Sequence, residues 1–280
     1  MLNQPLPDLA AWTLHLRTLP VPVLGASADA LATLSRIEDE TSNVDAHRIG
    51  EAVVDDPLAT LHILALAAHH RHARQITAAE TVTAAVLMLG IGPFFRACGQ
   101  LVTVEALLAE QPQALAGLQR VLQRTHRAGR FAIAFAVHRM EGDAELLRQA
   151  ALLHDFAELL LWCHAPALAQ QIVARQAADP TLRSEAAQRE LLNVSLGELE
   201  QSLMRVWHLP ERLIRLTDDH AEGHALVQTQ VRLVKLAVQL SRHTASSWNN
   251  AALPDDIDEI ASLLNLSITS TQRLLLHIDC

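Results

Sequence analysis

Residues 56–69 of the chain read DPLATLHILALAAH, and this stretch decides the fold class. Asp56 is a side-chain acceptor of the kind that caps a helix, and Pro57 stands at the first helical position, where its missing N–H costs nothing. Leucine and alanine then recur at spacings of three and four residues as far as His69. Because that spacing places them on one helix face, the stretch predicts a helix from Leu58 to His69.

The same spacing continues along nearly the whole chain, whereas the alternating β-branched runs typical of strands are almost absent. The sequence therefore predicts an all-α fold. Thr77 and Glu80 have the spacing of a capping box ahead of a helix at 82–89, which Gly90 ends. Further helices are expected at residues 115–139, 144–163, 166–178, 193–207, 210–220 and 223–242, and a last pair begins at 254–258.

Composition and charge exclude several classes of protein. Half of the 280 residues are hydrophobic, yet no apolar run approaches the roughly 20 residues that span a bilayer. The first 24 residues lack the basic start and apolar stretch of a secretory signal, and the net charge of −9 repels a polyphosphate backbone. We therefore expect a cytoplasmic protein with no membrane and no general nucleic-acid partner. Its three cysteines are widely spaced and are expected to be reduced and inert: Cys98, Cys163 and Cys280.

The sharpest local feature is the pair His154 and Asp155 within the apolar run LLHDF, residues 152–156. Burying two ionisable groups is costly unless they are paired, hydrogen-bonded or bound to metal. Either a buried hydrogen-bonded pair or a metal centre with ligands from other helices satisfies that requirement. His126, on an apolar helical stripe, is a candidate ligand or a core histidine bonded to a carbonyl. The run Asp218-Asp219-His220 is another candidate or simply a solvated helix end.

Four arginines form a second feature, because they lie within about 120° of one another on a helix: Arg120, Arg124, Arg127 and Arg130. Such a stripe could hold a phosphate, a nucleotide or an acidic partner surface through forked guanidinium contacts. The alternative is a solvated helix face. Acidic residues that would neutralise the stripe are sparse between Leu118 and Met140.

Two further segments have competing interpretations. The run His69-His70-Arg71-His72 suits metal in composition, but it also suits a helix end whose cations complement the helix dipole. Residues 257–278 have the outline of a helix-turn-helix, yet they carry only Arg273 as a basic residue and follow an acidic stretch. A DNA-binding regulator is therefore disfavoured, and these helices are expected to pack on the core.

Five segments in order resemble motifs of the HD-related output domain (HDOD) family, relatives of the HD metal-dependent phosphohydrolases: residues 19–22, 55–68, 81–90, 152–155 and 207–210. The resemblance implies an HDOD domain at 14–222, with an N-terminal helical lobe at about 14–110 packed against an HD-like core at about 111–222. Residues 223–280 would form a C-terminal helical segment packed on that core.

The resemblance also implies a degenerate metal site. Its positions fall on His126, His154, Asp155, Asn193, Asp219 and His220. The aspartate that closes the site in catalytic relatives falls near Val238, which cannot bind metal, and Asn193 is a poor ligand. No catalytic residue, metal or cofactor is therefore expected. The family's asparagine and serine after the 57–68 helix are also replaced, by Ala68 and His69.

The expected function is a non-catalytic bacterial signalling or regulatory module that binds a protein partner and is modulated by a nucleotide or another small ligand. The alternative is a metal-dependent phosphohydrolase acting on a nucleotide or cyclic dinucleotide. In that alternative His126, His154, Asp155 and His220 ligate one metal, and Asp219 assists or activates water.

Overall fold

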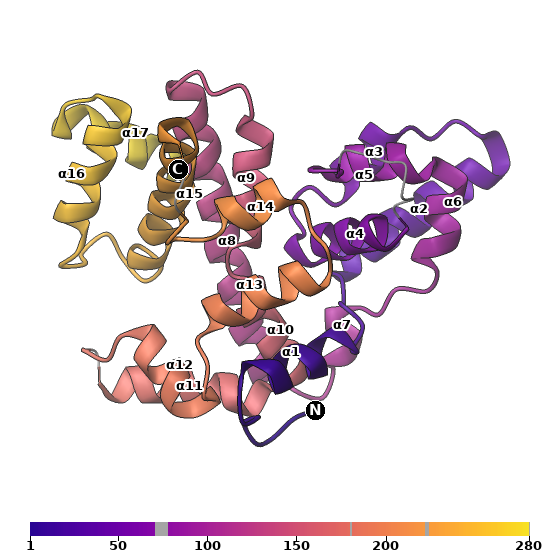
Figure 1. Ribbon diagram of the computed structural model, residues 1–280, viewed down its shortest axis with the longest axis horizontal. Coiled ribbons are helices and arrows are strands. Elements are labelled where there is room, and N and C mark those ends of the chain that lie inside the picture. The colour runs from indigo at the N-terminus through magenta and orange to yellow at the C-terminus, as the bar shows by residue number, and fades with distance from the viewer. Residues whose placement is uncertain (71–77, 180, 222–223, 280) are drawn as a thin grey trace. The chain divides into compact units, whose positions relative to one another are not determined.

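The computed structural model describes residues 1–70, 78–179, 181–221 and 224–279 (Figure 1). The helices are α1 (Leu9–Arg17), α2 (Gly25–Thr41), α3 (Ala46–Ala52), α4 (Pro57–His69), α5 (Val82–Leu89), α6 (Ile91–Cys98), α7 (Val104–Leu107), α8 (Pro112–His138), α9 (Ala144–Leu153), α10 (Phe156–His164), α11 (Pro166–Ala178), α12 (Ser184–Leu192), α13 (Leu196–Val206), α14 (Glu211–Leu216), α15 (Ala225–His243), α16 (Leu253–Leu264) and α17 (Ile268–Asp279). Within the described ranges the only β pairing is an isolated bridge between Val23 and Thr103. The predicted all-α fold is confirmed. None of the helices in these ranges combines the length and apolar character needed to cross a bilayer.

The local capping chemistry accounts for several helix boundaries. The Asp56 carboxylate accepts the N–H groups of Leu58 and Ala59 at 3.0 and 2.9 Å, as predicted for the start of α4. Thr81 caps α5 by accepting the N–H of Ala84, whereas the predicted cap Thr77 lies outside the described residues. Gly90 ends α5 with a φ of 82°, a conformation that favours glycine.

The helix predicted at residues 144–163 is in fact two helices, α9 and α10, separated at His154 and Asp155. Apolar residues on both sides of the break are buried, Leu153 before it and Phe156 after it. The hydrophobic pattern therefore continues through the break and does not reveal it. The two polar residues sit in the junction between helices and not inside one.

The chain forms two compact units, each made of two separate stretches. Unit 1 comprises residues 1–121 and 155–210, and unit 2 comprises residues 122–154 and 211–280. The boundaries at 121, 154 and 210 differ from the linear division at about 110 and 222 that the sequence predicts. Helix α8 contributes its first ten residues to unit 1 and the rest to unit 2.

In unit 1, the half-buried His62 and the buried His164 bond to carbonyl groups of residues 20–25, which lead into α2. A ring N–H of His164 bonds to the Pro20 carbonyl and one of His62 bonds to the Val21 carbonyl. The Nε2 atom of each ring is buried without a hydrogen-bond partner among the described residues. Burial lowers the pKa of both histidines, to about 4 for His164. Both rings are therefore neutral at neutral pH, and each holds one carbonyl group of the segment by a hydrogen bond.

The N–H groups of the same segment are taken by two carboxylates. Leu24 donates to Asp56 at 2.8 Å, and Gly25 donates to Glu105 at 2.8 Å. Because Asp56 is only 1% exposed and also caps α4, one carboxylate joins the segment to the start of that helix. The 20–25 segment is thus fixed by side chains from three helices, α4, α7 and α10.

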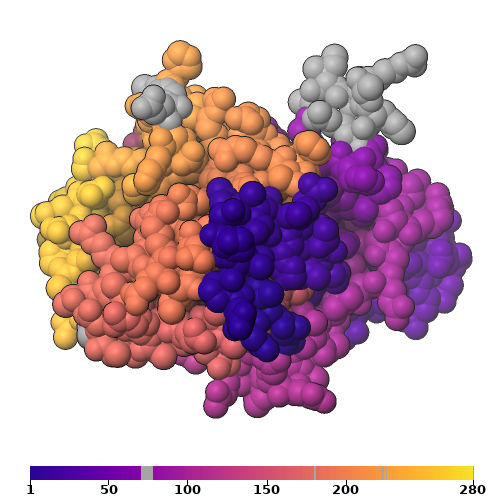
Figure 2. Space-filling model, turned by 60° about the horizontal axis from the view of Figure 1, so that its bottom comes forward, coloured from indigo at the N-terminus to yellow at the C-terminus, as the bar shows by residue number. Residues whose placement is uncertain are grey.

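The N-terminal residues of unit 1 lie along its surface, where Figure 2 shows them in indigo beside the salmon-coloured residues of α11–α13. The buried Trp12 of α1 donates its indole N–H to the Leu192 carbonyl at 2.8 Å. Nearby, Asn193 donates its amide to the Leu6 carbonyl at 3.0 Å. These bonds tie the beginning of the chain to α12 within unit 1.

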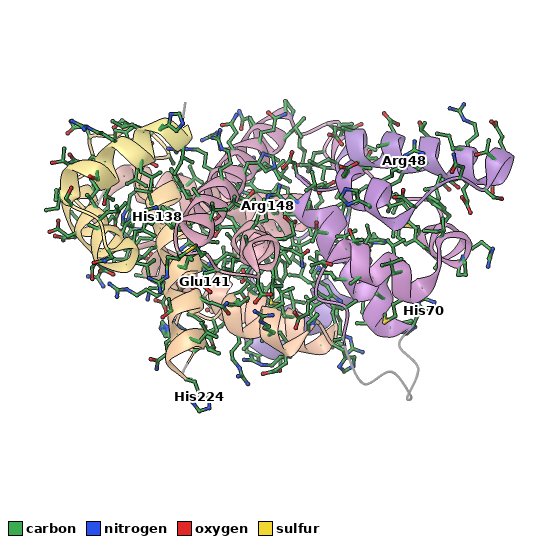
Figure 3. The ribbon with its side chains drawn as sticks, turned by 90° about the horizontal axis from the view of Figure 1, so that it is seen from above. Arg48, His70, His138, Glu141, Arg148 and His224 are labelled. Atoms are coloured by element: carbon green, nitrogen blue, oxygen red, sulfur yellow. The ribbon has the colours of Figure 1, made fainter. Side chains whose placement is uncertain are left out.

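Unit 2 is built around α15, which packs against α9, α14 and α16. Phe131 and Phe135 of α8 stack with ring centroids 6.2 Å apart in its core. Figure 3 labels His138 at the end of α8, Glu141 in the following turn and Arg148 in α9. Glu141 in that turn accepts from Gln230 of α15 at 3.2 Å.

Helix α16 packs on α15, and α17 packs on α16. Asp256 of α16 is 1% exposed and bonds to Gln239 and His243 of α15, at 2.7 and 2.5 Å. Asp279 of α17 reaches α8 through Arg127. Polar contacts therefore join both terminal helices to the body of unit 2.

Candidate functional site

The candidate site lies in unit 2 and is centred on His154, at the end of α9. His154 Nε2 and Asp219 Oδ1 are 3.1 Å apart. The histidine side chain is 9% exposed and the aspartate side chain 32% exposed, so the pair is reached by solvent only from the Asp219 side. The structure thus brings together two of the predicted positions.

The turn after α14 positions Asp219. Asp218 builds this turn, because its side chain accepts the His220 N–H at 3.0 Å and its carbonyl accepts the Ala221 N–H at 3.0 Å. His220 itself is exposed. Within the Asp218-Asp219-His220 run, the middle residue therefore faces His154 while its neighbours form the turn and the surface.

Two cationic side chains of α15 complete the site. Arg242 Nη2 lies 3.5 Å from His154 Nδ1, and Lys235 Nζ lies 3.5 Å from the Asp219 carbonyl oxygen. The two ring nitrogens of His154 therefore face groups of opposite charge, the Asp219 carboxylate at Nε2 and the Arg242 guanidinium at Nδ1.

The charges of the site keep Asp219 ionised. Burial raises the pKa of this carboxyl, but the hydrogen bond from His154 and the positive charges of Lys235 and Arg242 outweigh it. The pKa of Asp219 consequently lies below its ordinary value.

Lys235 and Arg242 are seven residues apart, which is two helical turns, so they share one face of α15. Val238 lies between them on that face and is 2% exposed. The family resemblance places the metal-binding aspartate of catalytic HD proteins at Val238. Here that position is apolar, with Lys235 one helical turn before it and Arg242 one turn after it.

These residues do not fit a metal ion. Across the described ranges, no group of three or more histidine, cysteine, aspartate or glutamate side chains is arranged to hold one. His154 and Asp219 are hydrogen-bonded to each other, and the nearby ammonium and guanidinium groups repel a divalent cation. The site therefore offers His154 and Asp219 as ligands, while the positive charges of Lys235 and Arg242 disfavour a bound metal ion.

Three further predicted metal positions are His126, Asp155, which directly follows His154, and Asn193. His126 is partly exposed on the unit 2 part of α8. Asp155 is buried and belongs to unit 1, as does Asn193. Asn193 ends α12 with a φ of 65° and donates to the Leu6 carbonyl, which is the behaviour of a helix cap.

The arginine stripe of α8 is divided by its contacts. Arg127 donates to both carboxylate oxygens of Asp279 at 2.7 Å and to Thr244, and Arg130 lies 3.7 Å from Asp279. Arg120 belongs to unit 1, is exposed and donates to the Ala116 carbonyl, while Arg124 is partly exposed. Arg127 therefore joins α8 to α17. The acidic residue that is missing near Arg127 in the sequence is supplied by Asp279 of the C-terminal helix.

Sequence reasoning missed Lys235 and Arg242. A usable signal existed, because Lys235 is the only lysine of the chain and both cations flank Val238 at helical spacing. Of the three cysteines, Cys98 and the buried Cys163 are free thiols, and burial raises their pKa values to about 11 and about 12, whereas Cys280 lies outside the described residues. Such thiols are poor nucleophiles.

Comparison with known proteins gives a family and a fold. The HDOD domain model matches residues 28–222. The MmoQ response regulator of Methylococcus capsulatus str. Bath is 18% identical, with a TM-score of 0.64 over 92% of this chain and 98% of that one. A virulence factor of Campylobacter jejuni subsp. jejuni is also 18% identical, with a TM-score of 0.63 over 95% and 92%. Likeness at this identity shows a shared fold. No curated protein sequence matches the chain.

Proposed function

Because the chain belongs to the HDOD family, we propose that it is a non-catalytic cytoplasmic signalling or regulatory module that acts by binding a protein partner. The observation that carries the proposal is the composition of the site around His154. There a hydrogen-bonded histidine and aspartate are accompanied by Lys235 and Arg242 in place of further metal ligands.

The chemistry of that site argues against hydrolysis of the HD type. Such a reaction needs several oxygen and imidazole donors around a metal, with an open position for an activated water. His154 uses one ring nitrogen toward Asp219 and the other toward Arg242. In this proposal the pair holds unit 2 together, and recognition takes place on the surface.

The fold agrees with this assignment, since it is shared with a protein described as a response regulator. The charge of the chain indicates the class of partner. Unit 1 contains 19 acidic and 11 basic residues, so it attracts a basic or neutral protein surface. Modulation by a nucleotide or another small ligand is part of the proposal.

The proposal is tested by the metal content of the protein, measured by elemental mass spectrometry. Untagged protein that has never met nickel resin is needed, because His69 and His70 are exposed at the end of α4. We expect no iron, manganese or zinc above background. About one metal per chain that is lost in His154→Ala would overturn the proposal in favour of a phosphohydrolase.

The stability of His154→Ala is the second measurement. The change leaves Asp219 without its hydrogen bond, so we expect the free energy of unfolding to fall by about 1 to 3 kcal/mol. The matched control is His220→Ala, one residue from the same aspartate but exposed, for which we expect less than about 0.5 kcal/mol. Urea denaturation gives both values, and equal small effects would remove the structural role of His154.

A further inference from the structure

Unit 1 contains a short parallel pairing between the segment before α2 and the segment between α6 and α7 (Figure 1). Val23 donates its N–H to the Val102 carbonyl at 2.9 Å, and its carbonyl accepts the Val104 N–H at 2.9 Å. Thr103, which lies between these two partners, is the residue paired with Val23. Since alternate residues of an extended chain direct their backbone groups to opposite sides, those of Thr103 and of Leu101 face away from Val23.

The outer edge of the segment before α2 is closed to a further strand. Pro22 has no N–H to donate. The Leu24 N–H is bonded to the Asp56 carboxylate, and the Pro20 carbonyl accepts from His164. Prolines and side chains that occupy the backbone groups of an edge prevent another strand from adding there.

The outer edge of the other segment is open. Across the described ranges, no hydrogen bond engages the N–H or the C=O of Leu101 or the N–H of Thr103. The Thr103 carbonyl is used by α7, because it accepts the Leu107 N–H at 3.0 Å. Solvent reaches this edge, since Leu101 and Thr103 are partly exposed and Val102 between them is 39% exposed. An exposed row of unpaired backbone donors and acceptors is what an added strand binds.

The charges near this edge indicate the sign of its partner. From residue 97 to residue 119, the charged side chains are Glu105 and Glu110, and both are exposed. The Glu105 carboxylate accepts the Gly25 N–H, which holds it two residues from Thr103. Negative charge without a neighbouring base favours a basic segment over an acidic one.

We propose that residues 101–103 form an edge to which an extended, basic segment of a partner protein adds as a β-strand. Backbone hydrogen bonds to Leu101 and Thr103 supply the affinity, and Val102 packs beside an apolar side chain of the added strand. The inference rests on the proposed function and deepens it, because it names the kind of segment that the partner must offer.

The probes are acetylated and amidated heptapeptides with valine, isoleucine or threonine at alternate positions and lysine or serine between them. We expect saturable binding to the full chain in fluorescence polarisation, with lysine preferred to serine. The amide hydrogens of Leu101 and Thr103 should exchange more slowly when a peptide is bound, because both become hydrogen-bonded. Absence of binding across the whole peptide set would overturn the proposal.

Methylation of the peptide nitrogens supplies a matched control. The two alternating sets of peptide residues direct their N–H groups to opposite sides of the strand. Methylation of the set that faces Leu101 should weaken binding roughly tenfold or more, whereas methylation of the other set should leave it unchanged. Equal weakening by both would show that the peptide does not bind as a strand, which contradicts the proposal.

Variants of the chain test the same edge from the other side. Leu101→Pro removes one edge donor and should weaken peptide binding roughly tenfold, whereas Gln100→Pro stiffens the same segment and should not, provided circular dichroism shows both proteins folded. Unchanged binding by Leu101→Pro would overturn the proposal. A dimer in sedimentation with the Leu101 and Thr103 amides protected without peptide would also overturn it, because the occupant would then be a second copy.

The two proposals can fail separately. Protein that holds no metal and binds no peptide would retain the proposed function and lose the strand edge. Protein that holds about one metal per chain, lost in His154→Ala, and still binds the peptides would retain the edge and lose the non-catalytic assignment.

Discussion

The two units place their histidines against different groups. In unit 1, His62 and His164 donate to main-chain carbonyls, and in the part of the chain that the structure describes their buried Nε2 atoms have no partner, so the neutral ring is favoured. In unit 2, His154 and His243 lie against the carboxylates of Asp219 and Asp256, at 3.1 and 2.5 Å. The histidines of unit 1 therefore bind backbone groups, whereas those of unit 2 bind carboxylates.

The overall charge of the chain follows the same division. Unit 1 has 19 acidic and 11 basic residues, and unit 2 has 12 and 11. Within unit 2 the two long helices α8 and α15 contain no acidic residue. Their cations are met by acids from turns and from α16 and α17, as with Arg127 and Asp279. Acids from other parts of unit 2 therefore pair with the cations of these two helices.

The largest expected effect tests the Asp56 carboxylate of unit 1, which binds three backbone N–H groups and the Ser27 side chain. Asp56→Ala leaves three N–H groups without their acceptor, those of Leu24, Leu58 and Ala59. We expect a loss of about 3 to 5 kcal/mol, since each buried orphan donor costs about 1 to 3 kcal/mol and partial rehydration recovers some of it. Asp45→Ala, an exposed cap that accepts only from Arg48, should cost about 1 kcal/mol. Urea denaturation measures both, and equal losses would show that Asp56 acts as an ordinary cap.

The next prediction concerns the pH dependence of stability, to which His164 of unit 1 contributes. Its folded-state pKa of about 4 lies below the ordinary 6.5 because of burial. As pH falls below 6.5 the unfolded chain takes up the proton first, so stability present above pH 6.5 is lost progressively down to about pH 4. We expect a loss of about 2 kcal/mol between pH 6.5 and 5, above the range in which most carboxylates titrate.

His164→Gln keeps a donor for the Pro20 carbonyl and removes the titration. Its stability should depend less on pH than that of the wild type across the same window, although His62 contributes in the same direction. Urea midpoints at pH 6.5, 5.75 and 5 give the comparison. Parallel curves for the two proteins would show that His164 does not control the acid sensitivity of unit 1.

The smallest effect tests the charge pairing of unit 2. Asp279→Asn removes the partner of Arg127, whose side chain is 16% exposed, and we expect a loss of about 1 to 2 kcal/mol that shrinks in high salt. Glu259→Gln breaks the exposed pair with Arg232 and should change stability by less than about 0.5 kcal/mol. If both variants lose the same amount in thermal unfolding, burial does not strengthen the Arg127 pair.

Sequence could predict what depends on neighbours along the chain. The Asp56 cap, the Gly90 stop and the all-α class follow from local chemistry. The break between α9 and α10 does not, because Leu153 and Phe156 are both buried and the apolar pattern crosses it. The pairing of Arg127 with Asp279 joins residues 152 positions apart, and no local pattern carries that information.

The candidate site shows the same limit. His154 and Asp219 could be selected as polar groups that need an explanation, and they lie together. Their cationic partners could not be found by searching for ligands, because Lys235 and Arg242 are the wrong chemistry for a metal. Their sequence signal is their position, because Lys235 and Arg242 each lie about one helical turn from Val238, where the family resemblance places a metal-binding aspartate.

The exchange of segments between the units has a consequence for how the protein is made. A ribosome releases residues 122–154 long before α15, which packs against α9 and buries Leu233 and Val234 in unit 2. Unit 2 therefore cannot close until nearly the whole chain has been synthesised, and unit 1 must wait for residue 210. A chain cut at residue 222, where the family match ends, would leave α9 and α14 without α15 and expose apolar surface. The core of unit 2 therefore includes helices that lie beyond the family match.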